Sequence, residues 1–171
     1  MSDLFQYPIS FPGWWLDYYY YVTWFLAMLF FAASWAVFFR YGKFNYGVDF
    51  GCLWKTTLMI AMTVVAIGVP SKYNTEFDAQ HGKDGDMIKL TSDRIEYTSR
   101  KGKKSMFLYK DIVSIYQEPV TYNPPPKVFI VAHNAGLRDS LFVTEGSHGL
   151  PDSGKLLTEL SQKTGLAVKR P

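Results

Sequence analysis

The sequence predicts a membrane α-helical hairpin joined to a small soluble β domain that one C-terminal helix closes. The first observation is the distribution of charge: residues 1–70 contain six charged side chains and residues 71–171 contain the other 27. The second is the distribution of aromatic residues, because 21 of the 30 lie in residues 1–70, including all five tryptophans. The third is a change of pattern after residue 86 from long apolar runs to short alternating ones. A uniform globular domain does not divide its charge in this way, so the composition favours a membrane segment followed by a water-soluble domain.

The first predicted membrane helix covers residues 18–39, which contain no charged residue. A helix of this length spans about 33 Å, enough for a hydrocarbon core of about 30 Å. Residues 1–17 are predicted to form an aromatic segment at the membrane interface, with Trp14 and Trp15 as anchors, because amphipathic rings favour the headgroup zone. This segment contains no Lys or Arg, so it lacks the basic start of a secretory signal peptide.

The second predicted membrane helix covers residues 52–70, after a loop at residues 40–51. Its uncharged stretch is short, so Lys55 has to extend its ammonium group to the interface, which Trp54 marks. Pro70 is expected to end this helix. The alternative is a buried helix of a soluble core, but the short loop after another spanning helix favours a hairpin.

Neither helix carries Asp, Glu, His or Arg in its middle, which argues against a transporter, a channel made by one subunit and a haem carrier. Small residues recur at a spacing of four, which allows helix backbones to approach closely. We expect them to pack within the hairpin, or alternatively to form an interface with another copy or a partner subunit. They are Ala32 and Ala36 on the first helix and Thr57 and Ala61 on the second.

After a polar connector at residues 71–86, residues 87–171 are predicted to form six to seven antiparallel strands in a small barrel or sandwich. Residues 100–104 and 134–136 have the composition of hairpin turns, and the prolines at 124–126 form a stiff connection after the fourth strand. The expected strands are Met87–Leu90, Arg94–Thr98, Ser105–Tyr109, Ile112–Gln117, Lys127–Ala132 and Ser140–Thr144.

One amphipathic helix follows these strands. Asp152 or Ser153 is expected as its N-cap and Gly165 as its stop, with an apolar stripe formed by Leu156, Leu157 and Leu160. Residues 166–169 are a last strand or an extended tail.

The stretch IKLTSDRIEYTSRKGKKSMFLYKDIVSIYQ (88–117) resembles the opening of bacterial pleckstrin-homology-like (PH-like) domains. In that family a strand of the type I-x-L-T runs into D-R-I, and a hairpin and a Y-x-D-I-x-S-I strand follow. The resemblance covers residues 86–168 and implies a PH-like barrel with a closing helix, here on a membrane hairpin. The Lys and Arg-x-Arg element with which eukaryotic members bind phosphoinositides has no match here, because Lys89 and Arg94 are not followed by that pattern.

No sequence signature of catalysis is present, so we expect a protein that is not an enzyme and that needs no cofactor or metal. The single Cys52 excludes an intramolecular disulfide framework and any zinc site built on several cysteines. The segment from His81 to Asp86 lacks the carboxylate spacing of a calcium loop and is interpreted as a solvated turn, while His133 and His148 have no local partner motif. The net charge of +3 gives no reason to expect nucleic acid.

The strongest candidate for a binding site is a basic hairpin, which could contact anionic lipid headgroups or a partner. Alternatively, its charges only keep a sheet edge soluble. It consists of Arg100, Lys101, Lys103 and Lys104.

Two functions compete. The first is a non-catalytic accessory subunit of a bacterial inner-membrane assembly, which docks through its helices and β domain on other membrane subunits or on itself. The second is a membrane-tethered binder of anionic lipid headgroups or a small ligand at the basic hairpin. By the positive-inside rule, the basic loop after the first helix would lie in the cytoplasm and both termini, with the β domain, in the periplasm. Residues 71–90 contain three lysines, however, as many as there are basic residues in the segment 40–55. Related anchored domains are cytoplasmic, and by this analogy we expect the β domain in the cytoplasm rather than in the periplasm.

Overall fold

The structure is a computed structural model that describes residues 3–41, 50–119, 125–134 and 137–171, without the side chains of 37–41, 50–53, 55 and 134. Its contacts divide the chain into two units. A helical unit comprises Pro12–Phe77, and a β unit combines Met1–Phe11 with Asp78–Pro171. Most of the predicted loop at 40–51, the start of the predicted proline connection at 124–126 and most of the turn predicted at 134–136 lie outside the described residues.

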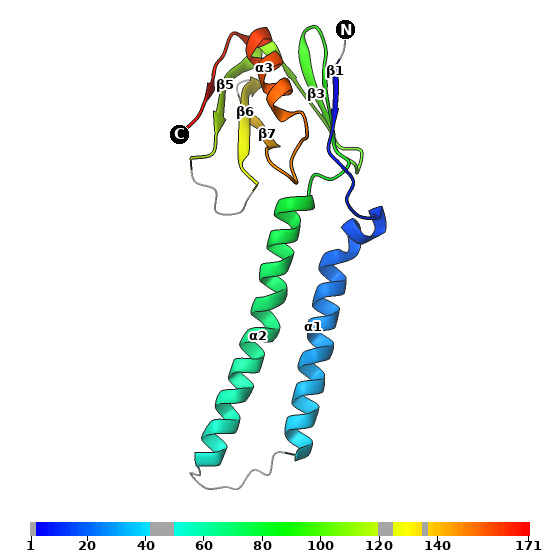
Figure 1. Cartoon of the computed structure of the whole chain (residues 1–171), viewed down its shortest axis with the longest axis vertical. Helices are drawn as coiled ribbons and strands as arrows, with labels where there is room; N and C mark the ends of the chain where they lie inside the picture. The colour runs from blue at the N-terminus through cyan, green and yellow to red at the C-terminus, as the bar shows by residue number, and fades with distance from the viewer. Residues whose placement is uncertain (1–2, 42–49, 120–124, 135–136) are drawn as a thin grey trace. The chain divides into compact units, whose positions relative to one another are not determined.

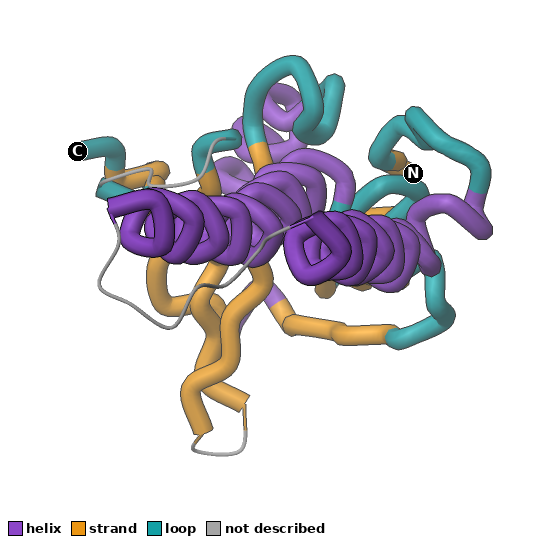
Figure 2. The backbone as a smooth tube through the Cα atoms, turned by 90° about the horizontal axis from the view of Figure 1, so that it is seen from below, coloured by secondary structure: helices purple, strands orange, loops and turns teal. Residues whose placement is uncertain are grey.

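The helical unit is an antiparallel pair formed by α1 (Gly13–Tyr41) and α2 (Phe50–His81), drawn in blue and in cyan to green in Figure 1. Figure 2, which looks along the helices, shows them side by side. Thr23 Oγ1 on α1 donates a hydrogen bond to Asn74 Oδ1 on α2 at 2.8 Å. The rings of Tyr19 and Phe77 stack with centroids 3.7 Å apart. Both helices extend beyond the predicted ranges 18–39 and 52–70.

Pro70 does not end the second helix, because it lies inside α2. A proline in a helix removes one backbone hydrogen bond, which a long helix can lose without stopping. The following turns contain helix-compatible residues, and Lys72 forms an i,i+4 ion pair with Glu76 at 3.7 Å. The predicted connector at residues 71–86 is therefore helical as far as His81.

The small residues that meet between the helices are also different from those predicted. Ala32, Ala36, Thr57 and Ala61 are all exposed. Ala66 is 8% exposed, and Ala27 and Ala66 line two apolar grooves of the hairpin. The spacing of small residues marks a helix face but does not say which face meets which neighbour. A role for the four predicted residues inside the hairpin is not confirmed, and a role at a partner interface stays a prediction.

The β unit contains two four-stranded sheets joined by a 3₁₀ turn, η1 (Tyr109–Asp111). The first has the order β1-β2-β3-β4 and is antiparallel throughout. The second has the order β7-β6-β5-β8, in which β8 pairs parallel with β5. The strands are β1 (Asp3–Gln6), β2 (Met87–Leu90), β3 (Arg94–Thr98), β4 (Lys104–Leu108), β5 (Ile112–Gln117), β6 (Lys127–Asn134), β7 (Leu137–Thr144) and β8 (Val168–Lys169).

The first strand was not predicted. Asp3–Gln6 pairs with β2 in the register Asp3↔Leu90 to Gln6↔Met87, and the side chains of Phe5 and Tyr7 are buried. Residues 1–17 are therefore not one interfacial segment. A four-residue strand is too short to show an alternating pattern that stands out beside seventeen residues rich in aromatic side chains. The helical hairpin is thus an insertion between two paired strands of one sheet.

Both sheets and α3 (Ser153–Thr164) contribute to one apolar core. The predicted stripe is confirmed, since Leu156, Leu157 and Leu160 are buried. Gly165 ends α3 in the left-handed conformation with φ 69°, which favours glycine. Asp152 occupies the N-cap position without a side-chain capping bond. The change of sheet falls at η1, earlier than the predicted break at the prolines.

Candidate functional site

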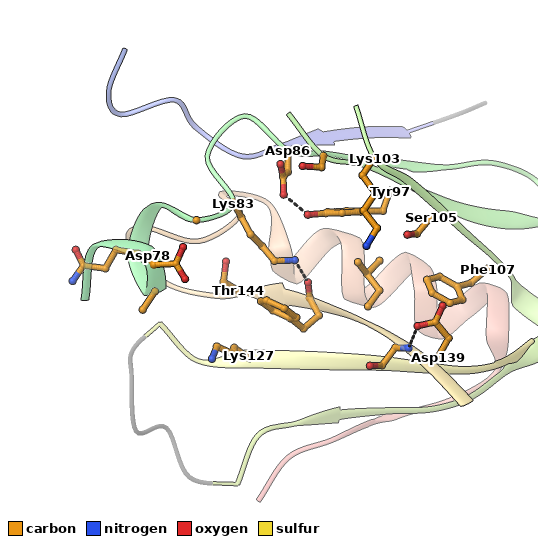
Figure 3. A pocket seen from close by; sticks show the side chains of 17 residues that line it. Asp78, Lys83, Asp86, Tyr97, Lys103, Ser105, Phe107, Lys127, Asp139 and Thr144 are labelled. Carbon is orange, nitrogen blue, oxygen red and sulfur yellow. Dashed lines mark hydrogen bonds between the residues drawn. The ribbon is translucent and has the colours of Figure 1, made fainter. Parts of the chain in front are cut away.

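A pocket of about 560 Å³ opens in the β unit between the two sheets (Figure 3). Its walls come from four places: the end of α2 with the turn after it, β3 and β4 with their connecting turn, the start of β6, and β7. The lining contains three lysines, three aspartates, several hydroxyl groups and two phenylalanines. Its charged members are Asp78, Lys83, Asp86, Lys103, Lys127 and Asp139.

Lys83 contributes a largely buried cation to this pocket. It follows α2 in a tight turn, and its Nζ donates a hydrogen bond to the backbone carbonyl of Phe142. The same nitrogen lies 3.7 Å from the centre of the Phe142 ring and 4.8 Å from that of Tyr97. Burial lowers the pKa of Lys83 to about 8, and the negative charge of Asp86 opposes this only in part.

Asp86 is the buried anion of the pocket, with 3% of its surface exposed. It accepts a hydrogen bond from the Tyr97 hydroxyl and another, at 2.8 Å, from the backbone N–H of Arg100. Burial and this carboxylate raise the pKa of Tyr97, because both disfavour a phenolate. Asp86 thereby holds the base of the β3–β4 hairpin to the turn after α2.

The other charged groups surround these two residues. Figure 3 shows Lys103 descending from the β3–β4 turn, with Asp78 and Asp139 toward opposite ends of the view. Lys127 Nζ lies 5.8 Å from the ring centre of Phe142, the ring that Lys83 also faces. Two ammonium groups therefore approach one ring of the second sheet, and Lys103 of the β3–β4 turn lines the same pocket.

The hydroxyl of Tyr7 fixes the strand end beside the pocket. It accepts a hydrogen bond from the backbone N–H of Thr144 at 3.0 Å, and Thr144 lines the pocket. Burial raises the pKa of Tyr7, although the hydrogen bonds from Thr144 act in the opposite direction.

The predicted basic hairpin exists as a tight turn between β3 and β4. Gly102 has φ 84°, and the N–H of Ser99 donates to the Lys103 carbonyl at 2.8 Å. Lys101, Lys103 and Lys104 are exposed. The structure does not gather the whole hairpin into one site, because only Lys103 of its four cations lines the pocket.

The segment from His81 to Asp86 forms a turn, as predicted, but its carboxylates are not solvated. Asp84 is 3% exposed and accepts a hydrogen bond from the backbone N–H of Ser10 at 3.0 Å. His81 Nδ1 lies 3.3 Å from the Asp84 carboxylate, and the His148 ring lies 5.4 Å from the His81 ring between centroids. Within the described ranges no group of three or more metal-ligating side chains comes together.

The predicted interfacial tryptophans lie at helix ends. Trp14 and Trp54 are 62% and 69% exposed. Trp15 is half-buried and packs edge-on against Trp14 and Tyr19.

The hairpin has an apolar outer surface and an apolar groove. The groove has a volume of about 290 Å³ and lies between α1 and α2, lined by Thr23, Ala27, Phe30, Val65, Ala66, Val69, Pro70 and Tyr73. Two buried donors of the hairpin, Trp24 Nε1 and Asn74 Nδ2, have no hydrogen-bond acceptor among the residues that the structure describes.

Comparison of the sequence with models of protein families and with curated protein sequences gives no match. The assignment of function therefore depends on the geometry described above.

Most of the pocket is not predictable from the sequence patterns considered above. Lys83 and Asp86 were assigned to a solvated turn, and Tyr97 and Phe142 were seen only as strand residues. The sequence signal that could have indicated the pocket was a lysine and two aspartates within residues 81–86, together with aromatic residues on the strands. Whether these residues converge depends on how the two sheets pack.

Proposed function

We propose that this chain is a non-catalytic, membrane-anchored accessory subunit of a bacterial inner-membrane assembly. The observation that carries the proposal is the pair of helical segments Gly13–Ala36 and Thr56–His81, each long and apolar enough to cross a membrane. Because residues 18–39 and 56–71 contain no charged side chain, the middle of each helix has no group suited to ion or proton transfer. Anchoring and docking are the roles that such helices can serve.

The outer surface of the hairpin supports docking on other membrane helices. Large apolar side chains are exposed along both helices, among them Phe25, Leu29, Ile60 and Val64. The groove between the helices would accept side chains of a partner helix, since packing of complementary shapes is a main source of helix association in lipid.

The β unit is the second docking element, and we propose that it is a PH-like domain. Two four-stranded sheets followed by a C-terminal helix are compatible with this proposal, as is the resemblance of residues 88–117. One fold serves many roles, so the proposed fold alone does not select the partner.

Co-purification tests the accessory role. The full-length chain, extracted in mild detergent through a C-terminal tag, should retain a stoichiometric membrane partner that mass spectrometry identifies. Val65→Phe, which fills the groove, should weaken this association more than the neighbouring Val64→Phe, which enlarges a side chain of the outer surface without entering the groove. A monodisperse monomer after gentle extraction would contradict the proposal.

We further propose that the β unit lies in the cytoplasm. Since β1 and β2 pair in one sheet, both ends of the helical hairpin have to emerge on the same side of the membrane. A Cys52→Ser, Ser147→Cys variant places a single thiol at an exposed position of the β unit. A membrane-impermeant maleimide should label it in inverted vesicles and not in intact spheroplasts, and the reverse would place the β unit outside.

The exposed lysines of the β3–β4 turn favour a second candidate, contact with anionic lipid headgroups. In nanodiscs containing phosphatidylserine, Lys101, Lys103 and Lys104 should be protected from acetylation relative to neutral nanodiscs, and high salt should remove this protection. Lys155 on α3 is the internal reference. Equal acetylation in both lipids would exclude this candidate.

A further inference from the structure

Lys83 is the side chain whose environment the proposed functions do not use. In the part of the chain that the structure describes, its Nζ forms no ion pair with a carboxylate and bonds instead to the backbone carbonyl of Phe142. Three rings approach it, those of Phe142, Tyr97 and Tyr7, with the last at 5.8 Å between Nζ and ring centre. The nearest carboxylate, Asp86, already accepts hydrogen bonds from Tyr97 and from the Arg100 backbone.

This environment favours the neutral amine more than water does. Aromatic faces stabilise an ammonium ion, but the loss of hydration is the larger effect, and it lowers the pKa of Lys83 to about 8. At neutral pH a far larger fraction of the Lys83 amine is then neutral than of an ordinary lysine, whose pKa lies near 10.5. A lysine desolvated in this way is a nucleophile at physiological pH.

The amine also lines a space that a small molecule could enter. The pocket of about 560 Å³ falls within the range of small-molecule sites. Lys127 approaches the same Phe142 ring as Lys83, and Lys103 enters from the opposite sheet. Two further cations in the same pocket provide a place for an anionic group of the molecule that reacts with Lys83.

We propose that Lys83 is a nucleophilic amine that forms an imine with small carbonyl compounds, and that Lys103 and Lys127 bind an anionic group of the same compound. The nitrogen lone pair attacks the carbonyl carbon and gives a carbinolamine. This intermediate loses its oxygen as water, with both amine hydrogens, and leaves a carbon–nitrogen double bond. No electrons are gained or lost, so the step needs no other reactant. This assignment is independent of the accessory role.

Pyridoxal 5′-phosphate is a suitable probe because it carries an aldehyde and a phosphate. The full-length chain in mild detergent is incubated with the probe, borohydride reduces any imine to a stable amine, and peptide mass mapping locates the adduct. Lys83 should be modified at least about tenfold faster than Lys155, whose side chain is 62% exposed on α3. Pyridoxal, which lacks the phosphate, should show a smaller ratio of Lys83 to Lys155 modification than the phosphate form does, a ratio that cancels the lower free-aldehyde content of pyridoxal.

Two variants separate the roles of the three lysines. Lys83→Arg keeps a cation but cannot form an imine, so the adduct should be lost from the pocket. Lys103→Gln with Lys127→Gln should leave Lys83 reactive and remove the advantage of the phosphate. Modification of wild-type Lys83 no faster than Lys155 would show that the lysine is purely structural and overturn the proposal. Equal Lys83-to-Lys155 ratios for pyridoxal and its phosphate would overturn the assigned ligand class.

Discussion

The hydroxyl oxygen of Tyr7 lies 3.0 Å from the backbone nitrogen of Thr144, which donates a hydrogen bond to it across 137 positions of the chain. Tyr7 directly follows β1, a strand of the first sheet, and Thr144 ends β7, an edge strand of the second. The backbone N–H of Tyr7 also donates to the Asp86 carbonyl at 2.9 Å. One residue near the start of the chain therefore joins both sheets beside the pocket.

Replacing Tyr7 with Phe should destabilise the β unit by about 1–3 kcal/mol, because the buried N–H of Thr144 loses its acceptor while the ring remains. The measurement is the temperature at which trypsin cleaves the β unit of the full-length chain in detergent. Tyr116→Phe on β5, a half-buried position, should change stability by less than about 0.5 kcal/mol. Equal losses in the two variants would show that the Tyr7–Thr144 bond has no special weight.

Joining residues 1–11 to residues 78–171 through a short linker should give a water-soluble, folded domain. The rings of Phe11 and His81 lie 5.0 Å apart between centroids, so a short Gly-Ser linker can replace the helical unit. Residues 87–171 alone should not fold, because they lack β1 and the buried side chains of Phe5 and Tyr7. Loss of one such aromatic side chain costs about 3–5 kcal/mol, a large share of a small domain's stability. Dispersion of amide signals in a ¹⁵N–¹H NMR spectrum distinguishes the two fragments, and a well-dispersed spectrum of 87–171 would contradict this prediction.

Two glycines near the C-terminal helix should respond in opposite ways to alanine. A Cβ at Gly149 would lie 2.4 Å from the carbonyl oxygen of Thr144, and this backbone atom cannot move without disturbing the strand end beside the pocket. Gly149→Ala should therefore destabilise by about 3 kcal/mol. A Cβ at Gly154 would meet nothing within 4 Å, so Gly154→Ala should stabilise α3 by up to about 1 kcal/mol. Chemical denaturation measures the stability of both variants. A Gly149→Ala variant as stable as the wild type would show that the turn has room to relax.

The stability of the β unit should rise with pH from about 8 toward 10. The unfolded chain keeps the proton on Lys83 up to its ordinary pKa of 10.5, whereas the folded chain releases it near 8. Between these values the unfolded state binds more protons, so the free energy of unfolding increases with pH, by at most about 3 kcal/mol in total.

Above pH 10 the free energy of unfolding should instead fall as the pH rises. The pKa values of Tyr7, Tyr97 and Tyr109 are raised by burial, that of Tyr109 to about 12, so the unfolded state releases these protons first. Lys83→Met should increase stability at pH 7 and remove the rise between 8 and 10, while Lys103→Met at the exposed turn should keep it. Thermal unfolding followed by near-ultraviolet circular dichroism at several pH values tests this, and a wild-type curve that is flat from 8 to 10 would contradict it.

The sequence was sufficient to predict those elements whose pattern is local. The bounds of β2, β3 and β5 follow from alternation and turn residues, and the end of α3 follows from Gly165. It was insufficient where several elements converge. The pairing of β1 with β2 joins segments separated by residues 7–86, and no local pattern records it. The surroundings of Lys83, which lies in a turn, likewise combine the rings of Tyr97 and Phe142 from one strand of each sheet with that of Tyr7. Only the assembled fold brings these side chains together.

The insertion of the helical hairpin between β1 and β2 couples the biogenesis of the two units. During synthesis β1 emerges first and has to wait, unpaired, until both helices and β2 have been made. If the hairpin crosses a bilayer as proposed, a single failed crossing would leave β1 and β2 on opposite sides of the membrane. The sheet could then not close, and Phe5 and Tyr7 would be missing from the core. Correct membrane insertion would thus be a precondition for a folded β unit, so a wrongly inserted chain would expose an incomplete core to cellular proteases.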